Sequence, residues 1–215
     1  MHAAAQKTEP LLKVMQGQPV IPVLKIDRVE DAVPLARALA RGGLPAIEIT
    51  LRTPAALEAI REASAEVPEA LVGAGTILDA VNFREAVAAG AQFIVSPGLT
   101  PQLIEAASSS EIPLLPGAIT PSEIMAARQA GYSLLKFFPA EQAGGTDFLK
   151  ALSSPLAGIR FCPTGGVSAS NAPDYLSLPN VLCVGGSWVA PDALVKAGKW
   201  DEIEALAREA STLKR

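Results

Sequence analysis

Short apolar runs recur along this chain at a nearly constant interval. Eight of them start about 20 to 25 residues apart, which is the length of one strand followed by one helix. A helix between two strands acts as a crossover connection, so the strands that it joins are parallel. We therefore expect strands at Val20–Leu24, Ala46–Thr50, Ala70–Ala74, Gln92–Ser96, Ile112–Leu115, Leu134–Phe138, Ile159–Cys162 and Val181–Val184.

Eight strand–helix units predict an α/β protein with a single (β/α)8 TIM barrel. The 215 residues are near the short end for this fold, so we expect one domain over residues 1–215 with few insertions. An N-terminal helix should precede Val20, and an amphipathic C-terminal helix should cover Trp200–Leu213. A doubly wound open sheet is the main alternative, because it uses the same alternating units.

Helix boundaries carry local signals. Thr53, Thr100 and Thr120 each precede a proline, and this pair suits a helix start because Thr caps the first turn and Pro fits the first helical position. Glu123 lies three residues after Thr120 and completes a capping-box pattern. Helix ends are indicated by glycines at positions 42–43, 90, 131 and 198.

Composition narrows the classes of partner. The net charge is −4 and no cluster of Lys or Arg is present, so we expect no nucleic-acid partner. Cys162 and Cys183 lie in apolar runs and read as buried free thiols, which favours a reducing cytoplasm. The sequence has no signal-peptide core and no bilayer-length apolar run, so we expect no membrane association.

The single histidine, His2, constrains the chemistry. Its place near the terminus nearly excludes histidine general-base catalysis and a Zn²⁺ site built on imidazoles, so we expect no metal and no cofactor. Catalysis then has to rest on Lys, Glu, Asp, Arg, Tyr or backbone groups.

Lys136 is an unusual residue for its position, because it lies inside the apolar run of residues 134–139. Period-two alternation puts it on one face with Leu134 and Phe138. If that face is the barrel interior, burial disfavours the charged ammonium, and a neutral amine can attack a ketone to form an imine. The alternative is a lysine on the outer face, with its stem packed between helices.

Glu48 and Arg52 share the polar face of the second expected strand, opposite an apolar face. Helices cover the outside of a barrel, so the polar face should point inward, with Glu48 as a general acid–base and Arg52 as a carboxylate binder. A structural Glu–Arg pair is the alternative. Thr76 follows the third strand and offers a hydroxyl, but from the residues alone a helix N-cap is the favoured explanation.

Two glycine pairs follow the last two strands. Gly165 and Gly166 come after the seventh strand, and residues 185–186 precede Ser187 after the eighth. Many barrels bind phosphate with these two loops, whose backbone N–H groups can hold an anion, although plain tight turns are the alternative. Lys25, at the end of the first strand, is a second candidate lysine, but Asp27 and Arg28 follow at once and place it nearer to solvent.

Together these residues resemble one family. Its pattern is matched by residues 48–53 (EITLRT), 72–76 (VGAGT), 96–98 (SPG), 136–141 (KFFPAE), 160–166 (RFCPTGG) and 185–188 (GGSW). The chain is similar, over about residues 18–207, to the 2-keto-3-deoxy-6-phosphogluconate (KDPG) aldolase family, which overlaps with 4-hydroxy-2-oxoglutarate (KHG) aldolase.

The resemblance implies roles for these residues. Lys136 would form the imine with the C2 keto group of pyruvate or of the sugar acid, and Glu48 would move protons. Arg52 and Thr76 would bind the pyruvate carboxylate. Other implied positions are Pro97, Phe138 and Thr164, which would line the site, and Gly165, Gly166 and Ser187, which would hold the phosphate of the aldehyde half. The resemblance also implies a homotrimer, and it leaves Lys25 outside the family pattern.

Three hypotheses follow. The first is a metal-independent lyase that cleaves KDPG, and also KHG, with its galactonate epimer as an alternative substrate. The second is a phosphosugar isomerase or epimerase, with Glu48 as the base and no covalent step. The third is a binding barrel without catalysis, but Lys136, Glu48, Arg52 and Thr164 are all present in the sequence, which favours the lyase.

Overall fold

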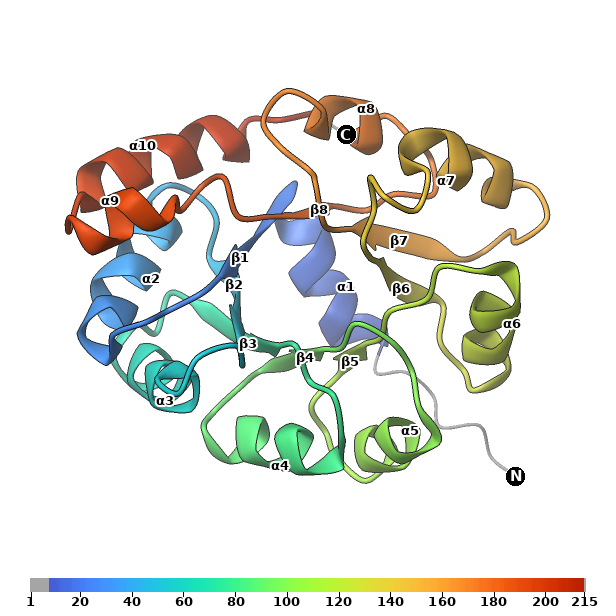
Figure 1. The fold of residues 1–215 in the computed structure, drawn as a ribbon, viewed down its shortest axis with the longest axis horizontal. Helices are drawn as coiled ribbons and strands as arrows, with labels where there is room; N and C mark the ends of the chain where they lie inside the picture. Colours follow the sequence, from blue (N-terminus) through green and yellow to red (C-terminus); the bar gives the residue numbers. More distant parts are fainter. Residues whose placement is uncertain (1–7, 215) are drawn as a thin grey trace.

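The computed structural model describes residues 8–214, and His2 lies outside this range. Parallel strands form the centre and helices surround them (Figure 1). The strands are β1 (Val20–Leu24), β2 (Ala46–Thr50), β3 (Leu71–Gly75), β4 (Phe93–Val95), β5 (Leu114–Leu115), β6 (Leu134–Phe137), β7 (Arg160–Pro163) and β8 (Val184–Gly186). Six of them pair in the order β5-β4-β3-β2-β1-β8, and β6 pairs with β7.

Short contacts join these two sheets into a closed barrel. Between β5 and β6, the Lys136 N–H donates to the Pro116 carbonyl at 2.8 Å, and the Ala118 N–H donates to the Lys136 carbonyl at 3.0 Å. Between β7 and β8, Phe161 bridges Val181 and Thr164 bridges Gly185. The ring is therefore a (β/α)8 barrel and not a doubly wound open sheet.

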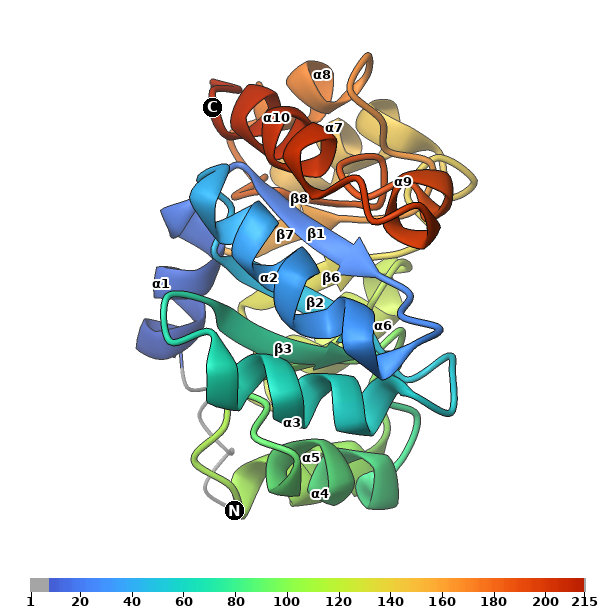
Figure 2. The ribbon, with the colours of Figure 1, turned by 90° about the vertical axis from the view of Figure 1, so that its left-hand side faces the viewer.

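The helices form the outer layer, and Figure 2 shows α2 and α3 covering β1, β2 and β3 from outside. The helices are α1 (Thr8–Gly17), α2 (Ala32–Arg41), α3 (Ala56–Glu66), α4 (Ala80–Ala88), α5 (Pro101–Ser108), α6 (Pro121–Gln129), α7 (Gly145–Ser153), α8 (Ala172–Leu176), α9 (Asp192–Lys196) and α10 (Trp200–Ser211), with a 3₁₀ turn, η1, at Val29–Asp31. Within residues 8–214, no helix is both long and apolar enough to cross a membrane.

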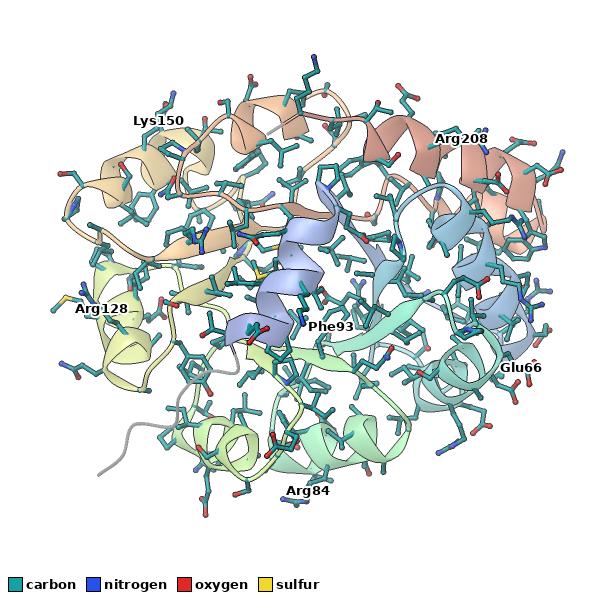
Figure 3. The ribbon with its side chains drawn as sticks, turned by 180° about the vertical axis from the view of Figure 1, so that it is seen from behind. Glu66, Arg84, Phe93, Arg128, Lys150 and Arg208 are labelled. Atoms are coloured by element: carbon teal, nitrogen blue, oxygen red, sulfur yellow. The ribbon has the colours of Figure 1, made fainter. Side chains whose placement is uncertain are left out.

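Alternation along the strands produces two apolar cores. The outward side chains pack against the helices in the larger core, to which Ile47, Ile49 and Phe161 belong. The inward side chains near the start of the strands form a smaller core, which includes Phe93. Helix α1 closes this end of the barrel with Leu11, Val14 and Met15, and Figure 3 shows it lying across the strands beside Phe93, with the charged side chains of Glu66, Arg84, Arg128, Lys150 and Arg208 on the periphery. The polar side chains of the barrel interior lie toward the opposite end, where the strands end.

Most local boundary signals are confirmed. Thr100 caps α5 and Thr120 caps α6, where Glu123 completes the capping box. Gly43, Gly90, Gly131 and Gly198 follow their helices with positive φ. The Thr53–Pro54 prediction is wrong: α3 begins at Ala56, and the Thr53 hydroxyl instead donates to the Ile26 carbonyl at 2.5 Å. A tertiary acceptor on the neighbouring β1 connection therefore takes the group that would have capped the helix.

The eighth strand lies later than expected. Val181 makes only an isolated bridge to Phe161, and the ladder with β1 covers Val184–Gly186, where Ile21 pairs with Gly185. Periodicity misplaced this strand because glycine carries no apolar side chain. The shift brings the two glycines of residues 185–186 into the barrel wall, directly below Ser187.

Candidate active site

Lys136 and Glu48 meet inside the barrel. Lys136 Nζ lies 3.1 Å from Glu48 Oε1, and the two side chains are 8% and 4% exposed. Their strands, β6 and β2, are not neighbours, so the contact crosses the barrel interior. The interior position predicted for Lys136 is confirmed, and the outer-face alternative is excluded. Glu48 pairs with this lysine and not with Arg52, so the proposed structural Glu–Arg pair is not formed.

Glycines in β3 give Glu48 the space to reach across. A Cβ atom placed on Gly75 would lie 2.0 Å from Glu48 Oε1, far inside any permitted contact. Strand register puts Thr50 opposite Gly75 and Glu48 opposite Gly73, so β3 has no side chain beside the carboxylate. The VGAGT segment thus keeps one wall of the site free for Glu48.

Phe138 covers the lysine from the rim. The Lys136 ammonium lies 5.4 Å from the centroid of the Phe138 ring, within the range of a cation–π contact. The ring is 38% exposed, which is unusual for a large apolar side chain. An exposed aromatic face beside a buried amine provides an apolar wall on which a small keto acid can pack.

Arg52 is positioned by Thr50. The guanidinium Nε donates to Thr50 Oγ1 at 2.9 Å, and the Thr50 hydroxyl donates to the Leu24 carbonyl at 2.7 Å. Thr50 is 2% exposed, so this relay is fixed within the barrel wall, whereas Arg52 itself is exposed at the mouth. From the sequence alone, Thr50 received no role. The signal that could have identified it is the alternation along the strand, which puts Thr50 on the same face as Glu48 and Arg52.

Thr76 holds an uncommon backbone conformation directly after β3. Its φ is 60°, the single positive value among the non-glycine residues of 8–214. Asp79, and not Thr76, caps α4, because its carboxylate accepts from the N–H groups of Val81 and Asn82 at 2.8 Å. The N-cap explanation for Thr76 is therefore wrong. Non-glycine residues with left-handed backbone are concentrated at functional sites. Their unfavourable conformational free energy must be offset by interactions in the rest of the structure.

Pro97 and Thr164 lie in the wall on either side of the lysine strand. Gly117 approaches so closely that a Cβ there would lie 2.1 Å from the Pro97 carbonyl oxygen, and Gly117 in turn bridges Lys136. Thr164 is 6% exposed, and a Cβ on Gly185 would lie 2.2 Å from its hydroxyl oxygen. Both residues therefore stand at strand ends next to the Lys136 layer.

The glycine loop after β7 presents free backbone donors. Gly165 and Gly166 have φ of 98° and 77°, and within the described residues no protein acceptor bonds their N–H groups. A Cβ on Gly165 would lie 3.2 Å from Cδ2 of Phe138, so this loop borders the lysine site. Ser187 is exposed directly after β8, the neighbouring strand. The two loops lie together, as an anion site at this end of a barrel requires.

Lys25 differs from Lys136 in its surroundings. Its ammonium lies 2.7 Å from Asp27 Oδ1, and its side chain is 41% exposed. The hydrogen bond to Asp27 raises the pKa of Lys25 above its ordinary value, which keeps the group charged and poorly nucleophilic. The ranking of the two lysines from sequence agrees with this geometry.

Other reactive groups are scarce around the site. In the part of the chain that the structure describes, no group of three or more His, Cys, Asp or Glu side chains could hold a metal ion. Cys162 and Cys183 are both buried as thiols, in agreement with their prediction as interior thiols. Cys162 is the register partner of Lys136 on β7.

Known proteins are similar to this chain in sequence and in fold. A family model described as KDPG and KHG aldolase matches residues 11–206. The 2-dehydro-3-deoxy-phosphogluconate aldolase of Pseudomonas aeruginosa is 52% identical over 210 residues, which cover 98% of this chain and 96% of the relative. The KHG/KDPG aldolase of Escherichia coli K12 is 51% identical over 197 residues, which cover 92% of each chain.

A solved structure adds a chemical state to this comparison. KDPG aldolase from Legionella pneumophila, with pyruvate captured as a covalent carbinolamine intermediate, has a TM-score of 0.92 and 47% identity, over 96% of this chain and 100% of that one. Sequence and architecture agree over nearly the full length, and this chain belongs to the KDPG and KHG aldolase family.

Proposed function

We propose that this protein is a Schiff-base aldolase that cleaves 2-keto-3-deoxy-6-phosphogluconate to pyruvate and glyceraldehyde 3-phosphate. The observation that carries the proposal is the buried contact of 3.1 Å between Lys136 Nζ and Glu48 Oε1. An amine in contact with a carboxylate, both shielded from water, has a proton acceptor at hand when it attacks a ketone. The names of the relatives in Pseudomonas aeruginosa and Escherichia coli support the same substrate class.

The reaction begins with transfer of a proton from the Lys136 ammonium to Glu48. The neutral amine adds to C2 of the substrate, and loss of water from the carbinolamine leaves a protonated imine. A base then removes the C4 hydroxyl proton, the C3–C4 bond breaks, and its electron pair flows into the imine as an enamine. The aldehyde leaves, C3 of the enamine takes up a proton, and hydrolysis releases pyruvate and restores the amine. Glu48 is the carboxylate placed to exchange these protons, directly or through a water molecule.

The binding roles divide along the rim. Arg52, fixed by Thr50, and Thr76 bind the pyruvate carboxylate, because a guanidinium and a hydroxyl both donate to carboxylate oxygens. The site walls are Pro97, Thr164 and the exposed face of Phe138. Gly165, Gly166 and Ser187 hold the phosphate through backbone N–H groups and a hydroxyl. No cofactor enters this scheme, because the protonated imine itself accepts the electrons.

The same imine chemistry serves 4-hydroxy-2-oxoglutarate, which has a carboxylate in place of the phosphate end. The Escherichia coli relative carries both substrates in its name, which supports this second activity. An isomerase or epimerase would need Glu48 as a base but no covalent amine, so the buried position of Lys136 argues against it.

Two further properties belong to the proposal. We infer a homotrimer in the cytoplasm. The exposed apolar side chains of Leu78, just before α4, of Val81, in its first turn, and of Met125, on α6, offer surface that a subunit contact would bury. Light scattering at several protein concentrations tests the assembly, and a monomeric mass throughout the range would contradict it.

Borohydride trapping tests the covalent step. The protein is incubated with pyruvate, reduced with borohydride and mapped by mass spectrometry. We expect one adduct, on Lys136, and none in the variant Lys136→Met, whereas Lys25→Met should label like the wild type. An adduct on Lys25 would retain imine chemistry but reject the assigned site. No adduct in folded protein would reject the covalent mechanism and favour the isomerase.

A further inference from the structure

The glycine loop after β7 is held from behind by the segment that follows β6. The Ala140 N–H donates to the Thr164 carbonyl at 2.8 Å, and the Glu141 N–H donates to the Gly165 carbonyl at 3.1 Å. These two bonds turn the carbonyl oxygens of the loop away from the free N–H groups of Gly165 and Gly166. The arrangement leaves donors on one side of the loop and acceptors on the other.

Glu141 brings a negative charge to this loop. A Cβ on Gly166 would lie 2.5 Å from Glu141 Cγ, so the stem of the side chain packs directly against the glycine. If the Glu141 carboxylate were free to turn toward the loop, it would repel any anion bound there. Like charges separated by a few ångströms repel strongly at a partly desolvated surface. An anion-binding loop with an acidic neighbour therefore needs a device that directs the carboxylate elsewhere.

Tyr175 is placed to do this. Its hydroxyl, on α8, donates a short hydrogen bond to Glu141 Oε1. Tyr175 is fully buried in the outer core, so the bond fixes the carboxylate between α8 and the start of α7, where a Cβ on Gly145 would lie 3.5 Å from Glu141 Oε1. Burial, and then the bond to Glu141, raise the pKa of Tyr175 above its ordinary value, which keeps its proton available as a donor. Asn171 ties the same loop to the segment before α8, because its amide donates to the Gly166 carbonyl at 3.1 Å.

We propose that Tyr175 is a positioning residue for phosphate recognition: it holds the Glu141 carboxylate away from the donor side of the Gly165–Gly166 loop, so that the loop can accept the phosphate of the aldehyde half. The inference rests on the proposed phosphate site and adds a residue that keeps this site able to bind phosphate. Neither Tyr175 nor Glu141 touches the substrate in this scheme. Their effect is electrostatic and is confined to substrates that carry the phosphate.

A pair of conservative variants tests the idea. Tyr175→Phe removes only the hydroxyl and frees the carboxylate. We expect the KM for KDPG to rise about tenfold, because the freed carboxylate repels the phosphate. The KM for unphosphorylated 2-keto-3-deoxygluconate and the rate of pyruvate trapping should change less than about twofold. In the double variant Tyr175→Phe/Glu141→Gln, the neutral amide no longer repels the phosphate, and the KM for KDPG should return close to the wild-type value.

Each other outcome overturns the proposal. A tenfold rise that Glu141→Gln does not reverse, or equal losses for both substrates, would mean that the bond only stabilises the loop. An unchanged KM in folded Tyr175→Phe would mean that the bond has no role in recognition. Glu141→Gln alone keeps an acceptor for Tyr175 and should bind KDPG at least as well as the wild type.

Ser187→Ala separates this idea from the phosphate site itself. A phosphate-selective loss in Ser187→Ala, without one in Tyr175→Phe, would retain the site and reject the role of Tyr175. Equal losses for both substrates in Ser187→Ala would reject the phosphate site, and the proposal for Tyr175 with it.

Discussion

Lys136 Nζ lies 3.1 Å from Glu48 Oε1, although 88 positions separate the two residues in the chain. Closure of the barrel creates this contact, because β2 and β6 face each other across the interior. Both groups are removed from bulk solvent, and each is the other's nearest charged partner among the ion pairs of the described residues. A buried ion pair of this kind contributes little net stability compared with apolar packing. A role in proton transfer is therefore the simpler explanation for its presence in the barrel.

Replacement of the carboxylate tests this use. Glu48→Gln keeps the shape and a hydrogen-bond acceptor but cannot take a proton from the ammonium. We expect kcat for KDPG cleavage to fall at least about 100-fold, the usual contribution of a general acid–base. Pyruvate release followed in a coupled assay measures it. Activity within about threefold of the wild type would assign the proton transfers to another group.

A substitution at Gly75, the glycine beside Glu48, provides a second test of the contact. In Gly75→Ala, a Cβ would lie 2.0 Å from Glu48 Oε1, so the carboxylate must turn away from Lys136. We expect a loss of kcat similar to that of Glu48→Gln, because a displaced carboxylate can no longer take the proton from Lys136. Gly17→Ala is the matched control, since a Cβ there meets nothing within 4 Å. Full activity of Gly75→Ala would show that the contact is not needed.

The relay from Leu24 through Thr50 to Arg52 predicts a binding effect. Thr50→Val keeps the volume but removes the hydroxyl that accepts from Arg52 Nε at 2.9 Å. We expect the KM for KDPG and the dissociation constant for pyruvate to rise about tenfold, because the guanidinium loses its fixed orientation. Arg52→Lys should show a similar loss, since a lysine cannot form the bidentate contact. A change in kcat alone would contradict a role in carboxylate binding.

The cap of α6 predicts a pH dependence of stability. The backbone N–H groups of Thr120 and then Ile119 donate to the Glu123 carboxylate and hold its pKa below its ordinary value. A lowered folded pKa stabilises the protein above the unfolded pKa, and this contribution is lost as the pH falls through the folded value. Glu123→Gln should therefore lower the free energy of unfolding at pH 7 by less than about 1 kcal/mol, since the group is exposed.

Denaturant titrations of wild type and Glu123→Gln at several pH values measure this effect. The difference in the free energy of unfolding should shrink on acidification below about pH 4.5, where the unfolded carboxyl becomes protonated. A difference that stays constant down to pH 3 would assign the effect to the neutral cap and not to the charge.

The sequence determined the order of the elements and singled out the candidate reacting residues. Alternation is a local property, so the run around Lys136 already put that lysine on one face with Leu134 and Phe138, and the polar face of β2 already contained Glu48 and Arg52. The start of α6 at Thr120 and its end before Gly131 could also be predicted from the sequence, because capping depends on a few neighbouring residues.

Only the tertiary structure decided which of these groups meet. The register of β8 moved to Val184–Gly186 because pairing with β1, and not local hydrophobicity, sets the ladder. Thr53 donates a hydrogen bond to the Ile26 carbonyl, Thr50 accepts one from Arg52, and Tyr175 donates one to Glu141. Each of these contacts depends on the stagger of the strands or on the position of a helix. Barrel closure fixes these distances through pairings far apart in sequence, which no local pattern of residues encodes.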